Sequence, residues 1–265
     1  METNPKDTLH PILVGGRDEP KIALFIDFEN IALGVREARY KSFEIAKVLE
    51  RLVEKGKIVY KKAYADWEAY GKYKQPFHEA GIELVEVPRT SYSGKNSADI
   101  RMVVDAMDLC YSKEHINVFT VASGDSDFSP LVSKLKENDK YVIGLGVKNS
   151  TSGLLVEACD EFIFYEDLVR EGSTQVQVKL RDLPKKQKEA FERIVNSVQA
   201  LIREDKEIIW GSMVKQSIKR KHPEFNEEYY GYRTFSQLLE DAQAHKLLGL
   251  KKDARSGSYI VTPLE

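Results

Sequence analysis

Between residues 20 and 168, short apolar runs alternate with longer amphipathic segments. The runs at residues 21–28 (KIALFIDF) and 140–147 (KYVIGLGV) are typical of strands that are buried on both faces of a parallel sheet. The segment at 43–55 instead repeats its apolar residues at the spacing of one helix face. Strands that alternate with helices predict an α/β fold, in which helices cover both faces of a parallel sheet.

This pattern predicts the individual elements of the larger part of the chain. Strands are expected at residues 21–28, 57–66, 82–88, 116–123, 140–147 and 161–167. Helices are expected at 43–55, 70–80, 98–111, 129–137 and near 154–159. Gly81 is suited to end the second of these helices, and residues 89–96 (RTSYSGKN) form a loop.

The pattern changes after residue 168. Few apolar residues occur before Pro184, and three helices are then expected at 187–203, 213–221 and 235–247. The last two apolar runs, LGLKKD and GSYIV, predict a hairpin around residues 255–257. Three helices and a hairpin describe a smaller winged helix-turn-helix domain. The predicted organisation is a flexible tail at 1–19, an α/β domain at 20–168, a linker at 169–184 and the winged-helix domain at 185–265.

Composition excludes several classes of protein. Of the 265 residues, 42% are hydrophobic and only 16 are Gly and 9 Pro, which excludes collagen-like and globally disordered chains. Cys110 and Cys159 form no CxxC pair, and two isolated thiols favour a reducing compartment. The five histidines lack HxxxH spacing, which argues against a zinc site. No apolar run approaches the roughly 18 residues of a membrane span. We therefore expect a soluble cytoplasmic protein without a signal peptide.

Charge is distributed unevenly along the chain. Of 40 basic and 42 acidic residues, 17 and 13 lie from Ser173 onward, so an acidic N-terminal part precedes a basic C-terminal part. Such an asymmetry suggests that the two parts of the chain have different tasks. Ordinary surface variation is the alternative explanation.

Acidic residues follow three of the predicted strands. Asp27 ends the first strand, Asp66 ends the second, and Asp125 and Asp127 end the fourth. Since the carboxyl ends of parallel strands meet at one edge of a sheet, we expect these side chains to lie near one another and near a ligand. The alternative for each is a helix N-cap. Clustered carboxylates repel and usually need a cation, and oxygen ligands without His or Cys favour Mg²⁺ or Mn²⁺.

The predicted helix at 98–111 carries a further acid. Asp99 lies three and four residues before Met102 and Val103, so it continues the buried stripe of the helix at its first turn. Asp99 is expected either to interact with the helix dipole or to point toward the strand-end acids. Asp105 lies about 240° around the helix from Asp99 and is interpreted as a supporting or surface residue.

Other catalytic signatures are missing from the sequence. There is no P-loop, no GxGxxG fingerprint and no Ser-His or Cys-His arrangement for a covalent nucleophile. Trp67 and Tyr92 are expected to pack ordinarily, with stacking on an unpaired base as the alternative.

Four motifs occur in order within residues 20–168. They are FIDFEN at 25–30, YADW at 64–67, GKNSADIRMVVDAMDL at 94–109 and SGDSDF at 123–128. Together they resemble the NYN domain, a relative of PIN-type nucleases, and ACDEFIFYEDL at 158–168 resembles the end of that domain. The resemblance implies a Rossmann-like parallel sheet with an acidic metal site.

The C-terminal part is similar to a second family. The stretch IWGSMVKQSIKRKHPEFNEEYYGYRTFSQLLEDA at 209–242, with the hairpin that follows, resembles the OST-HTH or LOTUS domain. This family has a winged helix-turn-helix fold, and its members are associated with RNA binding.

The two resemblances imply a metal-dependent ribonuclease, with hydrolysis of RNA phosphodiesters supported by Mg²⁺ or Mn²⁺. Metal ligands would be Asp27, Asp99 and Asp125. Asn30 would orient substrate or water, and Asp127 and Asp66 would assist directly or through water. Lys95 and Asn96 would contact phosphate. The alternatives are a non-catalytic RNA-binding or adaptor protein and a phosphohydrolase of small molecules.

The basic residues of the C-terminal domain would hold the backbone of single-stranded or structured RNA. They are Lys215, Lys219, Arg220, Lys221, Arg233, Lys251, Lys252 and Arg255. A solvated surface is the alternative, because Glu227, Glu228, Glu240 and Asp241 dilute the basic charge. The same surface is also suited to a protein partner.

Overall fold

The computed structural model describes residues 19–87, 97–170, 180, 183–204, 206–254 and 256–263. The chain divides into two compact units, one of Met1–Leu52 with Gly56–Arg170 and one of Val53–Lys55 with Glu171–Glu265. Residues 1–18 of the predicted tail at 1–19 and most of the predicted linker lie outside the described residues, and the boundaries of the predicted domains stay predictions.

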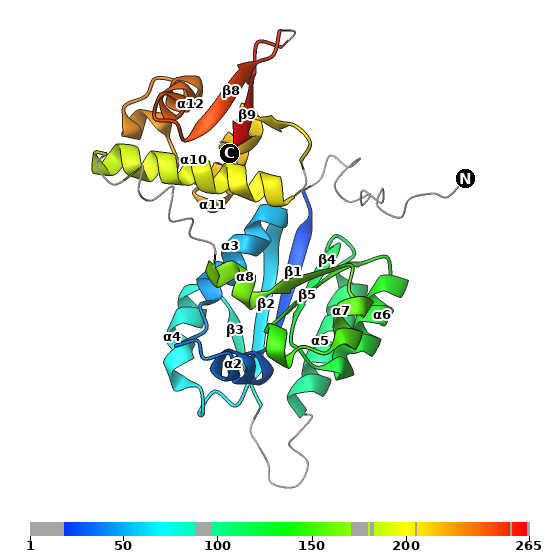
Figure 1. Ribbon diagram of the computed structural model, residues 1–265. Helices are drawn as coiled ribbons and strands as arrows, with labels where there is room; N and C mark the ends of the chain where they lie inside the picture. The colour runs from blue at the N-terminus through cyan, green and yellow to red at the C-terminus, as the bar shows by residue number, and fades with distance from the viewer. Residues whose placement is uncertain are drawn as a thin grey trace. The chain divides into compact units, whose positions relative to one another are not determined.

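A six-stranded parallel sheet forms the centre of the first unit (Figure 1). Its strands in spatial order are β3 (Glu83–Glu86), β2 (Lys57–Ala65), β1 (Lys21–Asp27), β4 (Val118–Ala122), β5 (Tyr141–Gly146) and β6 (Glu161–Phe164). The order runs outward in opposite directions from β1 and β4, as in other doubly wound folds. The predicted α/β class with a Rossmann-like parallel sheet is confirmed.

Helices cover both faces of this sheet. The first core packs α2 (Phe28–Glu37), α3 (Ile45–Lys55), α4 (Gly71–Glu79) and α8 (Tyr165–Arg170) against side chains such as Leu24 and Ile26 of β1. The second core packs α5 (Ser97–Ser112), α6 (Ser129–Glu137) and α7 (Gly153–Ala158) against Ala23 and Phe25. Successive residues of β1 thus serve opposite layers, which is why its sequence is apolar without alternation.

Two elements of this unit differ from the expectation. The pattern did not predict α2, which begins directly after β1, and it extended the last strand to residue 167, where the structure ends β6 at Phe164 and begins α8 at Tyr165. Glu166 and Asp167 lie in the first turn of α8, where acidic residues favour a helix start. Both errors arise because a strand passes into a helix without an intervening turn signal.

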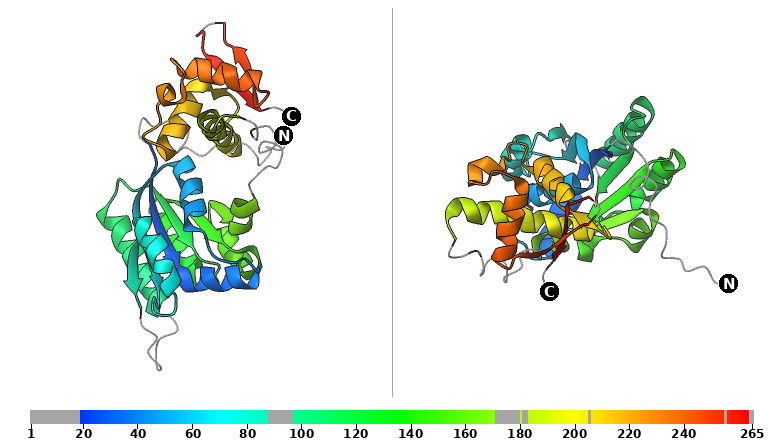
Figure 2. Two further views of the ribbon diagram at one scale, coloured as in Figure 1. Left: turned by 90° about the vertical axis from the view of Figure 1, so that its left-hand side faces the viewer. Right: turned by 90° about the horizontal axis from the view of Figure 1, so that it is seen from above.

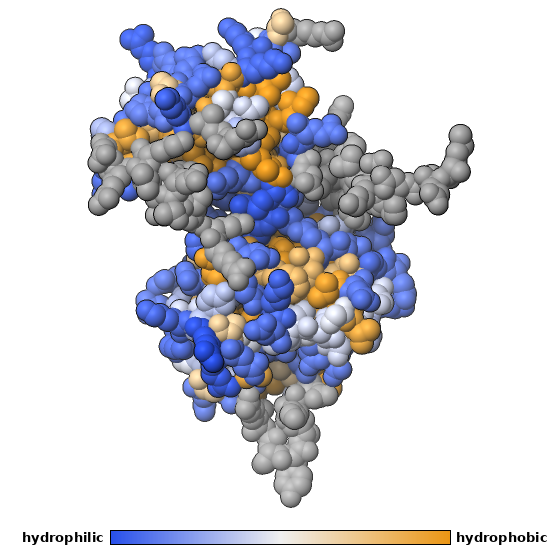
Figure 3. Space-filling view, in the orientation of Figure 1, coloured by the Kyte–Doolittle hydropathy of each residue, from blue (hydrophilic) through white to orange (hydrophobic). Residues whose placement is uncertain are grey.

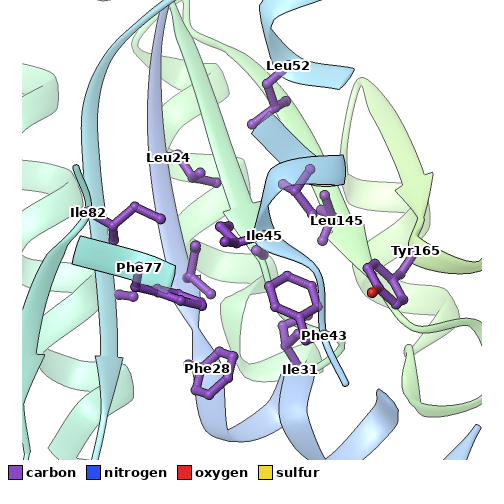
Figure 4. Close-up of a cluster of buried hydrophobic side chains, with 14 of the residues drawn as sticks. Leu24, Phe28, Ile31, Phe43, Ile45, Leu52, Phe77, Ile82, Leu145 and Tyr165 are labelled. Carbon is purple, nitrogen blue, oxygen red and sulfur yellow. The ribbon is translucent and has the colours of Figure 1, made fainter. Parts of the chain in front are cut away.

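Aromatic side chains lie among the aliphatic ones of the first core, and Phe28, Phe43, Phe77 and Tyr165 are labelled in Figure 4. The ring of Phe28 lies 5.2 Å from Trp67, 4.8 Å from Tyr73 and 4.9 Å from Phe77, measured between centroids. Trp67 is only 1% exposed and donates its indole N–H to the carbonyl of Val85 at 3.1 Å. The alternative that Trp67 stacks on a nucleic-acid base is therefore wrong, and Tyr92 lies outside the described residues.

The second unit contains three helices and a small antiparallel sheet, seen from two further sides in Figure 2. Its helices are α10 (Lys185–Arg203), α11 (Gly211–Lys221) and α12 (Phe235–Ala244), with the short 3-10 helix η3 (Glu227–Tyr230). Strands β8 (Leu248–Lys252) and β9 (Tyr259–Pro263) form the predicted hairpin, and β7 (Ile209–Trp210), which was not predicted, pairs with β9. The winged helix-turn-helix expectation is confirmed.

Both cysteines are free thiols. Cys110 is buried, and burial raises the pKa of Cys159 to about 11. Among the described residues, no helix combines the length and the apolar character that crossing a membrane requires.

The aromatic core generates a first prediction. Phe28→Ala should lower the free energy of unfolding of the first unit by about 3–5 kcal/mol, because a large buried ring is replaced by a cavity. Urea denaturation followed by fluorescence in a Trp210→Phe background, in which Trp67 is the remaining indole, measures this change. Leu33→Ala removes an exposed side chain from the same helix and should change the midpoint little. Equal effects of the two substitutions would contradict this account of the core.

Candidate functional site

Asp27 lies where the order of strands reverses. It is the last residue of β1, whose neighbours are β2 and β4. Its Oδ1 accepts the backbone N–H of Asn30 at 3.3 Å and its Oδ2 accepts the hydroxyl of Ser123 at 2.9 Å. Asp27 is therefore the N-cap of α2, as one of the two interpretations of the sequence expected, and it lies at the place where open α/β sheets bind ligands.

The environment of Asp27 disfavours its charge. Burial raises the pKa of Asp27 to about 7, and the negative charges of Asp99 and Glu29 act in the same direction. The hydrogen bonds from Ser123 and Asn30 act in the opposite direction but are outweighed. A buried carboxylate near other carboxylates is a feature of functional sites.

The turn after β4 is tied to the end of β1. The side-chain oxygen of Asn30 accepts the backbone N–H of Gly124 at 2.8 Å, and the hydroxyl oxygen of Ser123 accepts that of Asp125 at 3.2 Å. Asp125 caps η1 (Ser126–Phe128), because its Oδ1 accepts the N–H of Asp127 at 2.9 Å. These bonds hold Asp125 beside Asp27 at the same edge of the sheet.

A third segment, the loop at residues 147–152 after β5, packs against this turn. The N–H of Ser152 donates to the carbonyl of Gly124 at 2.8 Å. A Cβ atom on Gly124 would lie 2.3 Å from the backbone oxygen of Ser150, so no larger residue fits without displacing the backbone. The glycine between Ser123 and Asp125 is thus required by close packing of two loops.

Asp99 approaches from the other side of the sheet edge. It lies in the first turn of α5 and is half-buried. Burial raises the pKa of Asp99, and the negative charges of Asp125, Asp127 and Glu29 raise it further. Of the two expectations for Asp99, the one that directs it toward the strand-end acids agrees with these interactions.

Glu29 is a member of the cluster that the sequence interpretation missed. It lies in the first turn of α2, two residues after Asp27, and contributes to the raised pKa of both Asp27 and Asp99. Its Oε1 also accepts the N–H of Asp66 at 3.0 Å. A prediction of α2 would have found it, because the first turn of a helix that begins at a strand end points toward the same edge.

Asp66 is connected to the other acids through Glu29. Its own Oδ1 accepts the N–H of Glu68 at 3.2 Å and shapes the turn after β2. The bond shows that Asp66 stabilises a local turn. It is not a helix N-cap, because α4 begins at Gly71 with Tyr70 as its N-cap.

The acids share a neighbourhood without forming a closed coordination shell. Within the parts of the chain that the structure describes, no three His, Cys, Asp or Glu side chains converge closely enough to hold a metal ion between them. The donors are nevertheless hard carboxylate oxygens; burial raises the pKa of Asp27 and Asp99, and the neighbouring negative charges raise it further. A cation such as Mg²⁺ or Mn²⁺ would offset that repulsion, so the donor chemistry is suited to such an ion.

Asp105 is separate from this cluster. Its Oδ2 accepts the phenol O–H of Tyr64 at 2.9 Å and the ammonium of Lys62 at 3.0 Å, so it fastens α5 to β2. Burial alone would raise the pKa of Asp105, but the hydrogen bonds from Lys62 and Tyr64 lower it below its usual range. Asp105 is thus an ionised structural residue, which refines its interpretation as supporting or surface.

The predicted RNA-contacting residues of the first unit, Lys95 and Asn96, lie outside the described residues, as does Arg255 of the second. Of the predicted RNA-contacting residues in the second unit, Lys219, Arg220, Arg233, Lys251 and Lys252 are exposed and Lys221 is half-buried. Lys215 is half-buried and pairs with Glu227 at 2.7 Å. Figure 3 shows hydrophilic surface over much of both units, with hydrophobic surface over β8 and β9.

A doubly wound sheet with carboxylates gathered where its strand order reverses defines a Rossmann-like domain. The chain belongs to the NYN domain family, whose model matches residues 21–166, and the OST-HTH/LOTUS domain model matches residues 183–245. Both predicted resemblances are confirmed. The family assignment suggests a nuclease that uses divalent metals, and both domains are associated with nucleic acids.

Two similar proteins support the assignment without adding an activity. An uncharacterized protein of Methanocaldococcus jannaschii is 28% identical over 178 residues, which are 67% of this chain and 66% of that protein. The chain thus spans just under two thirds of the length of this relative. A crystal structure of a protein of unknown function from Vibrio parahaemolyticus is similar with a TM-score of 0.52 and 25% identity. That likeness covers 58% of this chain and 98% of the other.

The contact between the turn after β4 and the loop after β5 generates a second prediction. Gly124→Ala should lower the free energy of unfolding of the first unit by about 1–3 kcal/mol, because the added methyl collides with the backbone of Ser150. Gly153→Ala is the matched control, since a Cβ there meets no atom within 4 Å. Thermal unfolding of the two variants tests this, and an unchanged midpoint for Gly124→Ala would show that the two loops are not packed as described.

Asp105 generates a third prediction. A carboxylate whose pKa is lowered in the folded state stabilises above its unfolded pKa and ceases to do so as the pH falls through its folded pKa. Asp105→Asn should therefore cost about 1 kcal/mol at pH 7. The difference from wild type should vanish as the pH falls well below 3.8, the ordinary value of this group. Denaturation over this pH range measures it, with Asp108→Asn on the same helix as the control, and a difference that persists at low pH would refute the ionic origin.

Proposed function

We propose that the chain is a metal-dependent ribonuclease that hydrolyses RNA phosphodiesters, with the C-terminal winged-helix domain binding the RNA. The observation that carries the proposal is the cluster of carboxylates at the edge of the sheet where β1 and β4 end. Burial raises the pKa of Asp27 and of Asp99, and the charges of Asp99 on Asp27 and of Asp125, Asp127 and Glu29 on Asp99 raise it further. Such repulsion is a cost to the fold that a bound cation removes.

Asp27, Asp99 and Asp125 would hold Mg²⁺ or Mn²⁺ in this proposal. A bound ion of this kind supplies a water of lowered pKa and stabilises negative charge on the phosphate. Asp127 and Asp66, with Glu29 between Asp66 and the cluster, would assist through water molecules.

The neutral side chains of the cluster would position its acids. The hydroxyl of Ser123 donates to Asp27 and accepts from the backbone of Asp125, so one side chain sets the spacing of two proposed ligands. Asn30 uses its side-chain oxygen to hold Gly124, which leaves its amide N–H groups to orient substrate or water. The chain needs no covalent nucleophile for this chemistry.

Basic residues would bind the RNA backbone. Lys95 and Asn96 precede α5 and would contact phosphate near Asp99. In the second unit, the contacts would come from Lys215, Lys219, Arg220, Lys221, Arg233, Lys251, Lys252 and Arg255. The preference for RNA, single-stranded or structured, comes from the OST-HTH/LOTUS assignment.

A non-catalytic RNA-binding or adaptor protein is the second candidate. Two observations favour it: Asp27 and Asp125 each cap a helix, and no three acidic side chains converge on one point among the described residues. In this case the acids would serve the fold, and the RNA or a protein partner would be held without turnover.

Cleavage of end-labelled RNA distinguishes the two candidates. Single-stranded and structured RNAs are incubated with the full chain in Mg²⁺, Mn²⁺ or EDTA. Asp125→Asn keeps an oxygen for the capping bond to Asp127 but removes the charge, so it should fold normally and lose about a hundredfold or more of the activity. Asp139→Asn is the control, because Asp139 precedes β5 at the opposite edge of the sheet.

Each outcome has one meaning. Metal-dependent cleavage that is lost in Asp125→Asn and kept in Asp139→Asn supports the nuclease and its site. RNA binding without cleavage in any metal establishes the adaptor instead. Cleavage that survives both EDTA and Asp125→Asn would refute the proposed site.

A further inference from the structure

Helix α5 carries a second apolar stripe that faces away from the sheet. Its buried side packs Met102, Ala106 and Leu109 into the second core. On the opposite side, Ile100, Val104 and Tyr111 are 63%, 56% and 62% exposed. Single exposed apolar residues are ordinary, but three on one helix face form a patch, and such patches mark interaction sites.

The spacing of this stripe is that of a coiled-coil seam. With Met107, which is half-buried, the four residues follow one another at intervals of four, three and four. This is the a/d spacing that places side chains of one helix between those of another. At about 100° per residue, the four side chains fall within roughly 60° of the helix circumference.

The charged flank of the stripe is self-complementary. Arg101 and Asp108 lie along the same edge of the stripe, two turns apart, at positions equivalent to e in a heptad, and both are exposed. Within its own helix, Arg101 Nε also contacts Asp105 Oδ1 at 3.2 Å, and a guanidinium has further N–H groups for a second carboxylate. When two identical helices pack antiparallel about a two-fold axis, like edges meet. Arg101 then comes level with the partner's Asp108, and the reverse pair forms by symmetry. The other edge carries Val103 and Cys110, which offer no charge to pair in a parallel arrangement.

We infer that the outer face of α5 is the docking surface for a second copy of this chain, with the two helices antiparallel. The helix is already formed on the sheet, so association orders little backbone. Because the stripe is short, the interface would bury a small area for a specific protein–protein contact. The expected dimer is therefore weak and forms only at higher protein concentration. An apolar seam with both signs of charge does not complement RNA, whose backbone requires a basic surface.

This inference does not depend on the proposed nuclease activity. Asp99, the residue before Ile100, points to the acidic cluster from the first turn of the same helix. Dimerisation would therefore cover the helix that delivers Asp99 while leaving the edge of the sheet open.

Sedimentation velocity of the full chain over a range of concentrations tests the inference. Wild type should shift from the mass of one chain toward twice that mass as concentration rises. Val104→Glu places a charge in the seam and should hold the protein as a monomer throughout. Leu154→Glu changes a side chain on α7 that is 67% exposed, and it should dimerise like wild type.

Charge reversal identifies the partner and its orientation. Arg101→Asp and Asp108→Arg should each weaken the dimer by about tenfold or more, since like charges then meet. The double variant R101D/D108R should recover wild-type association, which loss of folding cannot imitate. Thermal unfolding confirms that each variant is folded. A wild type that stays monomeric at all concentrations, or a dimer that survives Val104→Glu, would overturn the inference.

Discussion

The site depends on one constraint: strands of a parallel sheet end at a common edge. β1 and β4 end there beside each other, where Ile26 pairs with Ala122, 96 residues further along the chain. Asp27 is buried at this edge. Its position is fixed because it caps the N-terminus of α2 and accepts a hydrogen bond from the hydroxyl of Ser123. The other acids are grouped around a carboxylate that the fold holds in an unfavourable environment. The sheet thus concentrates negative charge where an open α/β fold is able to bind a ligand.

The double use of Asp27 and Asp125 connects the fold to the site. A capping carboxylate uses one oxygen for a backbone N–H and retains lone pairs for another ligand. Capping and cation binding are therefore compatible duties of one side chain. The hydrogen bonds of Ser123 and Asn30 fix the spacing of these carboxylates, so a cation would meet oxygens that the backbone already orients.

The strands, most helices and the edge with the acids were predictable because they follow from hydrophobic period and from the rule for parallel strands. The helix α2, the strand β7 and the start of α8 were not, since each joins its neighbour without a turn residue. Glu29 was missed together with α2. The role of Asp105 required knowledge of Tyr64 and Lys62, which are about 40 residues away and meet it only through packing of α5 on β2. A periodicity shows which face of a helix is buried, but it does not reveal its partners.

The strand order also bears on how the chain folds. The central strand β1 is synthesised first, yet its inner neighbour β4 follows only after the whole β2–α4–β3–α5 half of the sheet. Pairing β1 with β4 closes a long loop, and such non-local contacts form slowly. Until then, the apolar residues of β1 have one neighbouring strand instead of two. The edge that carries the acids is therefore completed late, after the chain has been made at least as far as η1, and the nascent N-terminal half lacks the Ser123 hydroxyl that donates to Asp27.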